Sequence, residues 1–126
     1  MTFRIGETYS RREISDELGG QIQHYLPFKG DKILCGCFRP ERRYSPEAPE
    51  KVHFGKGDVV LKTAKLMSQQ SEPIPVFLCE RARKWKYIGL YRCYGYTTEP
   101  SVLKQEERKY PERGIIKGVL YFKGVR

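Results

Sequence analysis

The sequence of 126 residues contains no long hydrophobic run. A membrane-spanning helix needs about 20 consecutive apolar residues, and no stretch approaches that length. The first ten residues, MTFRIGETYS, also lack the apolar segment of a secretory signal peptide. We therefore expect an intracellular protein with no membrane partner, nuclear in a eukaryote or cytoplasmic in a bacterium.

Residues that usually carry catalysis or hold metals are scarce. The chain has two histidines and four cysteines, and no HNH cluster, paired-carboxylate nuclease motif, P-loop or nucleotide-binding glycine motif. Structural zinc usually requires CxxC pairs. Here Cys35 and Cys37 form a CxC pair, and Cys79 and Cys93 are isolated in expected strands. This pattern favours buried free thiols over zinc, so we expect no enzyme activity, no metal and no cofactor.

Acidic residues are also few relative to basic ones. Lys and Arg total 24 and Asp and Glu total 15, which gives a net charge of +9. Such a surplus attracts polyanions. Aromatic residues make up 13% of the chain and include nine tyrosines, whose rings suit stacking on bases. Nucleic acid is therefore favoured over another anionic partner or no charged partner.

Helix and strand signals alternate along the chain. Ser10 and Glu13 form a capping box that begins a helix over residues 10–18, and Gly19 and Gly20 end it. Apolar spacing predicts a second helix over 59–70. We expect strands at 32–38, 52–54, 74–79, 85–94 and 115–122, a hairpin at 81–84 and a proline-rich loop at 39–49. The segment 97–113 is polar and has no assignment.

The order of these elements indicates one domain over residues 1–126. Helices and strands do not alternate regularly, which is typical of an α+β fold. We expect a small twisted or barrel-like β-sheet with two short helices at its edge. Nothing in the sequence fixes the oligomeric state, and a monomer is the default expectation.

Basic residues cluster beside aromatic ones, as in proteins that contact phosphates and stack bases. The candidate phosphate contacts are Arg39, Arg42 and Arg43 in the 39–49 loop and Arg81, Arg83, Lys84 and Lys86 around Trp85. The segment after the first expected helix is a candidate for a loop that contacts DNA. Its residues Gly19, Gly20, Gln21, Gln23 and His24 form either a loop that approaches DNA or an ordinary turn.

Three segments together resemble a known family. They are YSRREISDELGGQIQHYLP, KILCGCFRP and PIPVFLCERARKWKYIGLYR. The pattern resembles the modified-base-reading domains of the SRA (SET- and RING-associated) and PUA-like folds that accompany HNH nucleases in McrA-type restriction enzymes. It is also similar to a fungal domain of unknown function with a W-x-Y-x-G-x-Y segment, here Trp85, Tyr87, Gly89 and Tyr91. The resemblance covers residues 9–94 and includes no nuclease residues, and the loop RRYSPEAP lacks an expected Asn-Pro.

The resemblance implies a reader that flips a modified base out of double-stranded DNA. The flipped base would be 5-methylcytosine or 5-hydroxymethylcytosine, favoured over N6-methyladenine. Candidate pocket rings are Tyr25, Phe38, Trp85 and Tyr91, and candidates for reading the base edge are Asp31, Gln21 and Gln23. An RNA-binding PUA-like module and a protein-interaction domain remain the alternatives.

Overall fold

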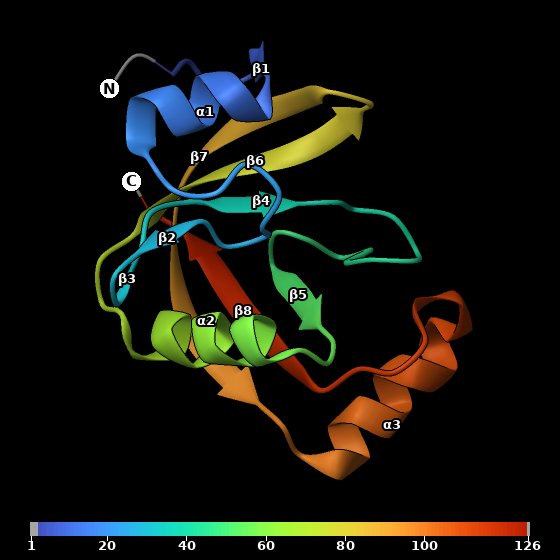
Figure 1. Ribbon diagram of the computed structural model, residues 1–126. Coiled ribbons are helices and arrows are strands. Elements are labelled where there is room, and N and C mark those ends of the chain that lie inside the picture. The colour runs from blue at the N-terminus through green and yellow to red at the C-terminus, as the bar shows by residue number, and fades with distance from the viewer. Residues whose placement is uncertain (1–2, 126) are drawn as a thin grey trace.

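The computed structural model describes residues 3–125 and has an α+β fold with three helices and a mixed six-stranded sheet (Figure 1). In chain order the elements are β1 (Thr8–Tyr9), α1 (Arg11–Leu18), β2 (Phe28–Lys29), β3 (Lys32–Ile33), β4 (Gly36–Phe38), β5 (Lys51–Phe54), α2 (Asp58–Gln69), β6 (Ile74–Arg81), β7 (Lys84–Thr97), α3 (Pro100–Lys109), the short 3₁₀ turn η1 (Pro111–Arg113) and β8 (Gly118–Gly124).

The main sheet is open. Its strand order is β4-β6-β7-β8-β5, and β1 pairs with β7 outside this path. The β4–β6 pair is parallel and the other pairs are antiparallel, while β2 and β3 form a separate hairpin. The expected α+β class is confirmed. The sheet does not close into a barrel, and residues 3–125 contain three helices instead of the expected two.

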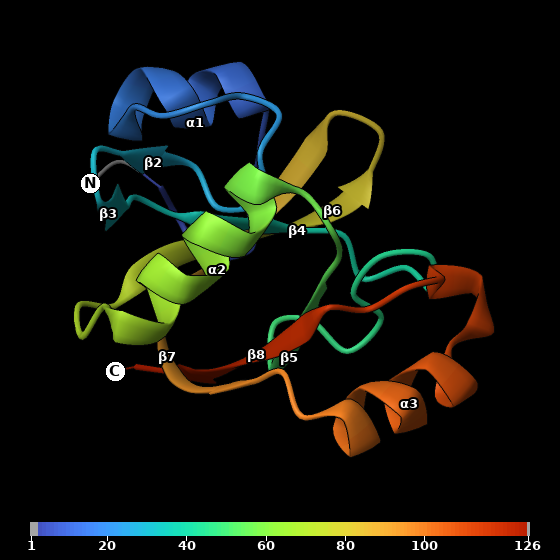
Figure 2. The same ribbon diagram turned by 60° about the horizontal axis from the view of Figure 1, so that its bottom comes forward.

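Two hydrophobic clusters fill the interior. One includes Ile14 of α1 and the other includes Ala64 and Met67 of α2, and these two helices lie apart in Figure 2. Strand β6 contributes to both, because Val76 belongs to the α2 cluster and the next residue, Phe77, to the α1 cluster. Successive side chains of a strand point to opposite faces. Burial on both faces therefore explains why the sequence IPVFLC is continuously apolar.

Helix α1 begins and ends as its sequence predicts. The Glu13 N–H donates to Ser10 Oγ at 3.0 Å, and the Ser10 N–H donates to Glu13 Oε1 at 2.9 Å. The expected capping box is therefore confirmed. After the helix, Gly19 and Gly20 both have positive φ, and the Gly19 N–H donates to the Ser15 carbonyl at 2.7 Å.

The strand expected at 32–38 is two strands with different partners. Lys32–Ile33 pairs with β2, whereas Gly36–Phe38 pairs with β6. Between them the chain passes from one sheet to the other, and the Leu34 N–H donates to the Pro27 carbonyl at 2.8 Å. The strand expected at 115–122 begins only at Gly118. Helix α2, strands β5, β6 and β7 and the basic hairpin lie close to their expected places.

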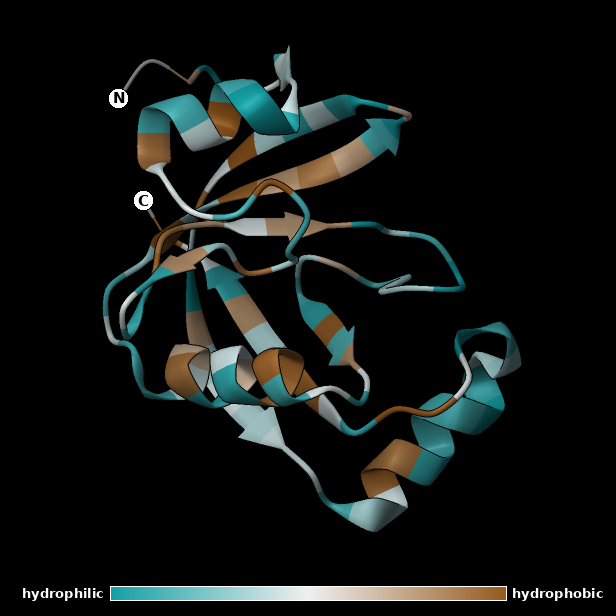
Figure 3. Ribbon diagram, viewed as in Figure 1, coloured by the Kyte–Doolittle hydropathy of each residue, from teal (hydrophilic) through white to brown (hydrophobic). Residues whose placement is uncertain are grey.

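Most of the unassigned segment 97–113 is α3 and η1. Hydrophilic residues predominate in α3, and Glu106 is its one buried residue (Figure 3). Ion pairs tie η1 and α3 to the 39–49 loop, from Arg42 Nε to Glu112 of η1 at 2.7 Å and from Lys109 Nζ of α3 to Glu47 at 3.1 Å. Figures 1 and 2 both show this loop beside the end of α3. None of the helices in residues 3–125 has the length and apolar character needed to cross a membrane.

Candidate nucleic-acid interface

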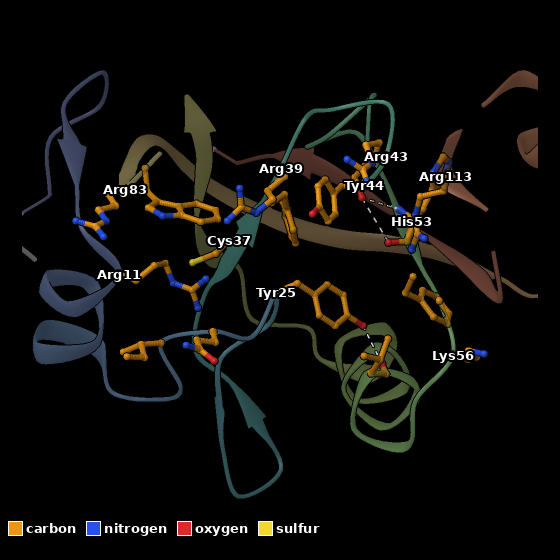
Figure 4. Close-up of a pocket in the computed structure, with 18 of the residues that line it drawn as sticks. Arg11, Tyr25, Cys37, Arg39, Arg43, Tyr44, His53, Lys56, Arg83 and Arg113 are labelled. Carbon is orange, nitrogen blue, oxygen red and sulfur yellow. Dashed lines mark hydrogen bonds between the residues drawn. The ribbon is translucent and has the colours of Figure 1, made fainter. Parts of the chain in front are cut away.

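A groove of about 990 Å³ lies where five distant segments meet (Figure 4). Its lining residues come from the start of α1 and the loop after it, from β4 and the 39–45 segment, from β5 and the start of α2, from the tip of the β6–β7 hairpin, and from the segment after α3. Ligand pockets are typically about 300–1,000 Å³ in volume. The groove is thus large enough for a nucleotide with its phosphates.

The charges that line the groove are all positive. Six cationic side chains contribute, and no Asp or Glu does: Arg11, Arg39, Arg43, Lys56, Arg83 and Arg113. Of these six cations, only Arg39 forms an ion pair within residues 3–125, with Glu41 at 3.8 Å. Cations in a concave surface without carboxylates produce a positive potential that attracts phosphates.

Two aromatic rings in the groove are accessible to a ligand. Phe38 and Phe54 are each 2% exposed and Trp85 is 4% exposed, so these three belong to the interior. Tyr44 is 47% exposed, and Tyr25 is partly exposed. In Figure 4, Tyr44 from the 39–49 loop and Tyr25 from the segment before β2 lie on either side of the groove.

Tyr25 is held in place through both its backbone and its ring. Its hydroxyl donates to the Val60 carbonyl at 2.8 Å, and its carbonyl accepts from the Cys37 N–H at 2.8 Å. Burial raises the pKa of the Tyr25 hydroxyl well above its ordinary value, so the side chain is neutral. The ring is therefore a preorganised apolar surface with its polar tip already bonded.

Trp85 is buried, and two arginines lie over its ring. The guanidinium carbons of Arg11 and Arg39 lie 5.1 and 5.3 Å from the ring, within the distance of a cation–π contact. Arg39 also lies 5.6 Å from the Tyr44 ring and donates to Cys79 Sγ at 3.7 Å. Trp85 therefore positions groove cations and does not offer an open stacking face.

Arg11 also fixes the segment that follows α1. Its Nη2 donates to the carbonyls of Gln21 at 3.2 Å and His24 at 2.7 Å. The side-chain amide of Gln21 bonds the backbone of Phe28 twice, and His24 Nδ1 accepts from the Leu26 N–H at 3.2 Å. Gln21 and His24 thus hold the loop together and do not line the groove, whereas the exposed Gln23 does.

The opposite end of the groove contains His53 and Arg113. His53 Nε2 lies 2.8 Å from Glu106 Oε1, and Lys51 Nζ lies 3.0 Å from Glu106 Oε2. Burial acts to raise the pKa of Glu106, but its bonds to Lys51 and His53 outweigh that effect and lower it, so Glu106 is a carboxylate. His53 Nδ1 and Arg113 Nε are both buried and have no hydrogen-bond partner among the described residues.

The structure brings some of the expected site residues together and separates others. Gln23, Tyr25, Phe38, Trp85, Arg39, Arg43 and Arg83 line the groove. Asp31 borders a separate hollow near the end of α2, and Tyr91 packs against the α2 cluster. The expected residues that lie outside the groove lining also include Gly19, Gly20, Gln21, His24, Arg42, Arg81, Lys84 and Lys86. Of these, Arg42 is paired with Glu112 and Lys86 with Glu80.

Several polar residues of the groove lining were not predicted from the sequence. Tyr44, His53 and Lys56 were not singled out as site residues, and Arg11 had no assigned role. Tyr44 carries a readable signal, because it follows Arg42 and Arg43 in an exposed proline-rich loop. Arg113 ends the segment 97–113, to which the sequence assigns no structure, so its place in the groove depends on α3 and η1.

All four cysteines are buried and free. A hydrogen bond with Cys37, together with burial, raises the pKa of Cys35. Cys37 lines the groove and belongs to the α1 cluster, whereas Cys93 belongs to the α2 cluster. The described residues contain no group of three or more His, Cys, Asp or Glu arranged to hold a metal ion.

Comparison with known proteins gives a family without an assigned activity. Neither the curated proteins nor the solved structures contain a significant match to the chain. One protein family, described as "Domain of unknown function (DUF6697)", matches residues 8–113, which include every element from β1 to η1 and nearly all of the groove. The chain belongs to the DUF6697 family.

Proposed function

We propose that this chain is a non-catalytic domain that binds double-stranded DNA and takes one modified base, flipped out of the duplex, into the groove. The observation that carries the proposal is the composition of the groove lining. Six cations, no carboxylate and two accessible tyrosine rings share a groove of about 990 Å³. The resemblance to SRA and PUA-like readers supports the same function.

The cations supply the part of the binding that does not depend on sequence. Each Lys or Arg that neutralises a phosphate releases a condensed counterion. Arg39, Arg43 and Arg83 are exposed, so phosphates reach them without displacing an existing buried partner. Contacts with about four to six phosphates predict that log K falls against log salt with a slope of about −4 to −5.

The rings supply the part that selects a flipped base. Flipping costs a few kcal/mol of lost stacking and pairing, and stacking on an aromatic ring returns about 1–3 kcal/mol per base. Tyr25 and Tyr44 lie on either side of the groove and suit this role (Figure 4). A methyl group buried beside them adds about 1 kcal/mol, which favours a methylated base over its plain counterpart only modestly.

An RNA-binding module is the alternative. The same cations and rings suit an unpaired base of a single strand, for which no flipping cost arises. A protein-interaction domain that takes an acidic segment would use the cations but not the rings. The three functions therefore differ in what they require of the ligand: a modified duplex, a single strand or a peptide.

The test is a comparison of affinities across matched ligands. Fluorescence anisotropy measures binding to one duplex sequence that is plain or carries 5-methylcytosine, 5-hydroxymethylcytosine or N6-methyladenine, and to the corresponding single-stranded RNA. We expect one modified duplex to bind about 5- to 30-fold more tightly than the plain duplex, with the salt slope given above. Tighter binding to RNA than to every duplex, or equal binding to all duplexes, contradicts the proposal.

A further inference from the structure

Arg83 has a backbone conformation that is otherwise found only at glycines in the described chain. Within residues 3–125, seven glycines and one other residue, Arg83, have a positive φ, and that of Arg83 is +64°. Residues with a Cβ are disfavoured in this left-handed region, because the Cβ comes too close to the following carbonyl oxygen. The free protein therefore contains local strain at Arg83.

The hairpin between β6 and β7 requires this conformation. Arg81 pairs with Lys84, which leaves Ala82 and Arg83 as a two-residue turn. Turns this short usually need a positive φ at a central residue, which is why glycine and asparagine are common there. The strain therefore comes from the side chain and not from the fold, and a glycine would form the same turn without it.

No contact within the described residues explains an arginine at this position. The Arg83 side chain is exposed and forms no ion pair, hydrogen bond or ring contact with another described residue. Arg11 and Arg39 differ in this respect, because both lie over the Trp85 ring and both donate hydrogen bonds within the protein. Strained residues of this kind cluster at functional sites, where a ligand supplies the missing contacts.

The location of Arg83 indicates what that ligand is. Arg83 lines the groove at the end away from His53 and Arg113 (Figure 4). Because its side chain is exposed, a ligand reaches the guanidinium without any rearrangement of the protein. No carboxylate lines the groove, so the guanidinium has no competing acceptor there. Its forked N–H groups match the geometry of a phosphate.

We propose that Arg83 binds a backbone phosphate of the nucleic acid strand in the groove, and that the β6–β7 turn keeps a strained arginine, with a loss of stability, because of this contact. The inference rests on the proposed function and deepens it by assigning one phosphate to the tip of this hairpin. The tight turn fixes the direction in which the side chain leaves the backbone. Part of the ordering that binding requires is therefore already present in the free protein.

Removing the side chain should stabilise the protein and weaken binding at the same time. Arg83→Gly keeps the turn and relieves the strain, and this gain exceeds the additional entropy that a glycine loses on folding. We expect the Tm to rise by about 2 to 6 °C. In anisotropy titrations with a plain DNA duplex, affinity at low salt should fall about tenfold, because a hydrogen-bonded charge is lost. The salt slope should become shallower by about one.

Matched variants separate the strain from the charge. Arg83→Asn should behave like Arg83→Gly, because asparagine also tolerates a positive φ. Arg83→Lys keeps both the strain and the charge, so its Tm and its salt slope should stay close to those of the wild type. Ala82 has no positive φ and lies outside the groove lining, so Ala82→Gly should not raise the Tm or change binding. Arg108→Gln removes an exposed arginine of α3 outside the groove and should change neither.

The outcomes separate this inference from the proposed function. If the wild type and Arg83→Gly bind duplex DNA with equal affinity and equal salt slope, the role of Arg83 is wrong and the proposed function stands. If both Arg83→Gly and Arg83→Asn bind more weakly but are no more stable than the wild type, the link between strain and binding is wrong. An equal loss of affinity in Arg108→Gln shows a general charge effect and overturns the inference.

Single-stranded oligothymidylate provides the converse case. If the wild type binds oligothymidylate and no duplex, and Arg83→Gly gains stability and loses this binding, the inference stands and the proposed function is wrong. If the wild type binds neither ligand, both are wrong.

Discussion

Tyr44 is the groove ring with the most accessible surface, and its surroundings suit a base. It is 47% exposed, and the Arg39 guanidinium lies 5.6 Å from its ring. An arginine that already covers part of a ring keeps it in place while leaving the rest of the ring open. The other accessible ring, Tyr25, is fixed by its bond to Val60. The two tyrosines thus differ in how they are held, but both present apolar faces.

Replacing Tyr44 should remove base recognition and leave phosphate binding. Tyr44→Ala should weaken binding to the preferred modified duplex by about 1–3 kcal/mol, the value of one stacked ring, and weaken plain duplex binding much less. Tyr94→Ala is the matched control, because Tyr94 is 65% exposed on β7 outside the groove. Anisotropy titrations measure both. If the two variants lose equal affinity, the groove is not the site of the base.

For single residues, the sequence predicts which side chains are basic or aromatic better than it predicts which of them are exposed. The basic residues around Trp85 are correctly read as a cluster, and Arg83 reaches the groove. The sequence does not show that two arginines lie over the ring of Trp85 or that Tyr91 packs against the interior. It also does not show that Glu106 lies 2.8 Å from His53, a contact between residues far apart in the chain.

At the scale of elements, the loop after α1 depends on a close approach of backbone and side chains. Gly20 has a φ of +83°, and a Cβ at this position would lie 2.9 Å from Pro27 Cβ. Glycine is therefore required both for the backbone conformation and for space. The loop that carries Gln23 and Tyr25 to the groove follows directly from this turn.

Alanine at Gly20 should destabilise the protein more than alanine at Gly30. Gly30 also has a positive φ, +60°, but nothing lies within 4 Å of a Cβ added there. Both variants incur the backbone cost of about 1–2 kcal/mol, and Gly20→Ala adds about 1–3 kcal/mol of overpacking. Urea unfolding measures the difference. Equal losses of unfolding free energy would show that the loop moves away at no cost.

Elements with strong local signals are the ones that the sequence predicts. The capping box of α1 and the apolar spacing of α2 each lie within one segment, and both helices are confirmed. Helix α3 is missed because it is mostly polar and is attached by ion pairs to residues distant in the sequence, from Glu106 to β5 and from Lys109 to the 39–49 loop. The division of 32–38 is missed because it depends on which strands pair, which local pattern does not encode.

At the scale of the whole molecule, the distribution of charge matters more than its sum. The net charge of +9 is the excess of 24 basic residues over 15 acidic residues. Outside the groove, acidic partners neutralise many of the basic residues, as in Lys32 with Glu72, Lys86 with Glu80 and Lys109 with Glu47. The groove has no lining carboxylate, so an unbalanced share of the positive charge lies there. An open sheet whose edge strands β4 and β5 both border the groove makes this arrangement possible.

The most direct test of the account is whether a base leaves the duplex on binding. A duplex with 2-aminopurine beside the modified base is titrated with the protein, and fluorescence is followed to saturation. We predict that fluorescence rises with the modified duplex, because the probe loses a stacked neighbour when that base is flipped, and rises much less with the plain one. Saturated binding without a fluorescence change for any modified duplex would contradict base flipping into the groove.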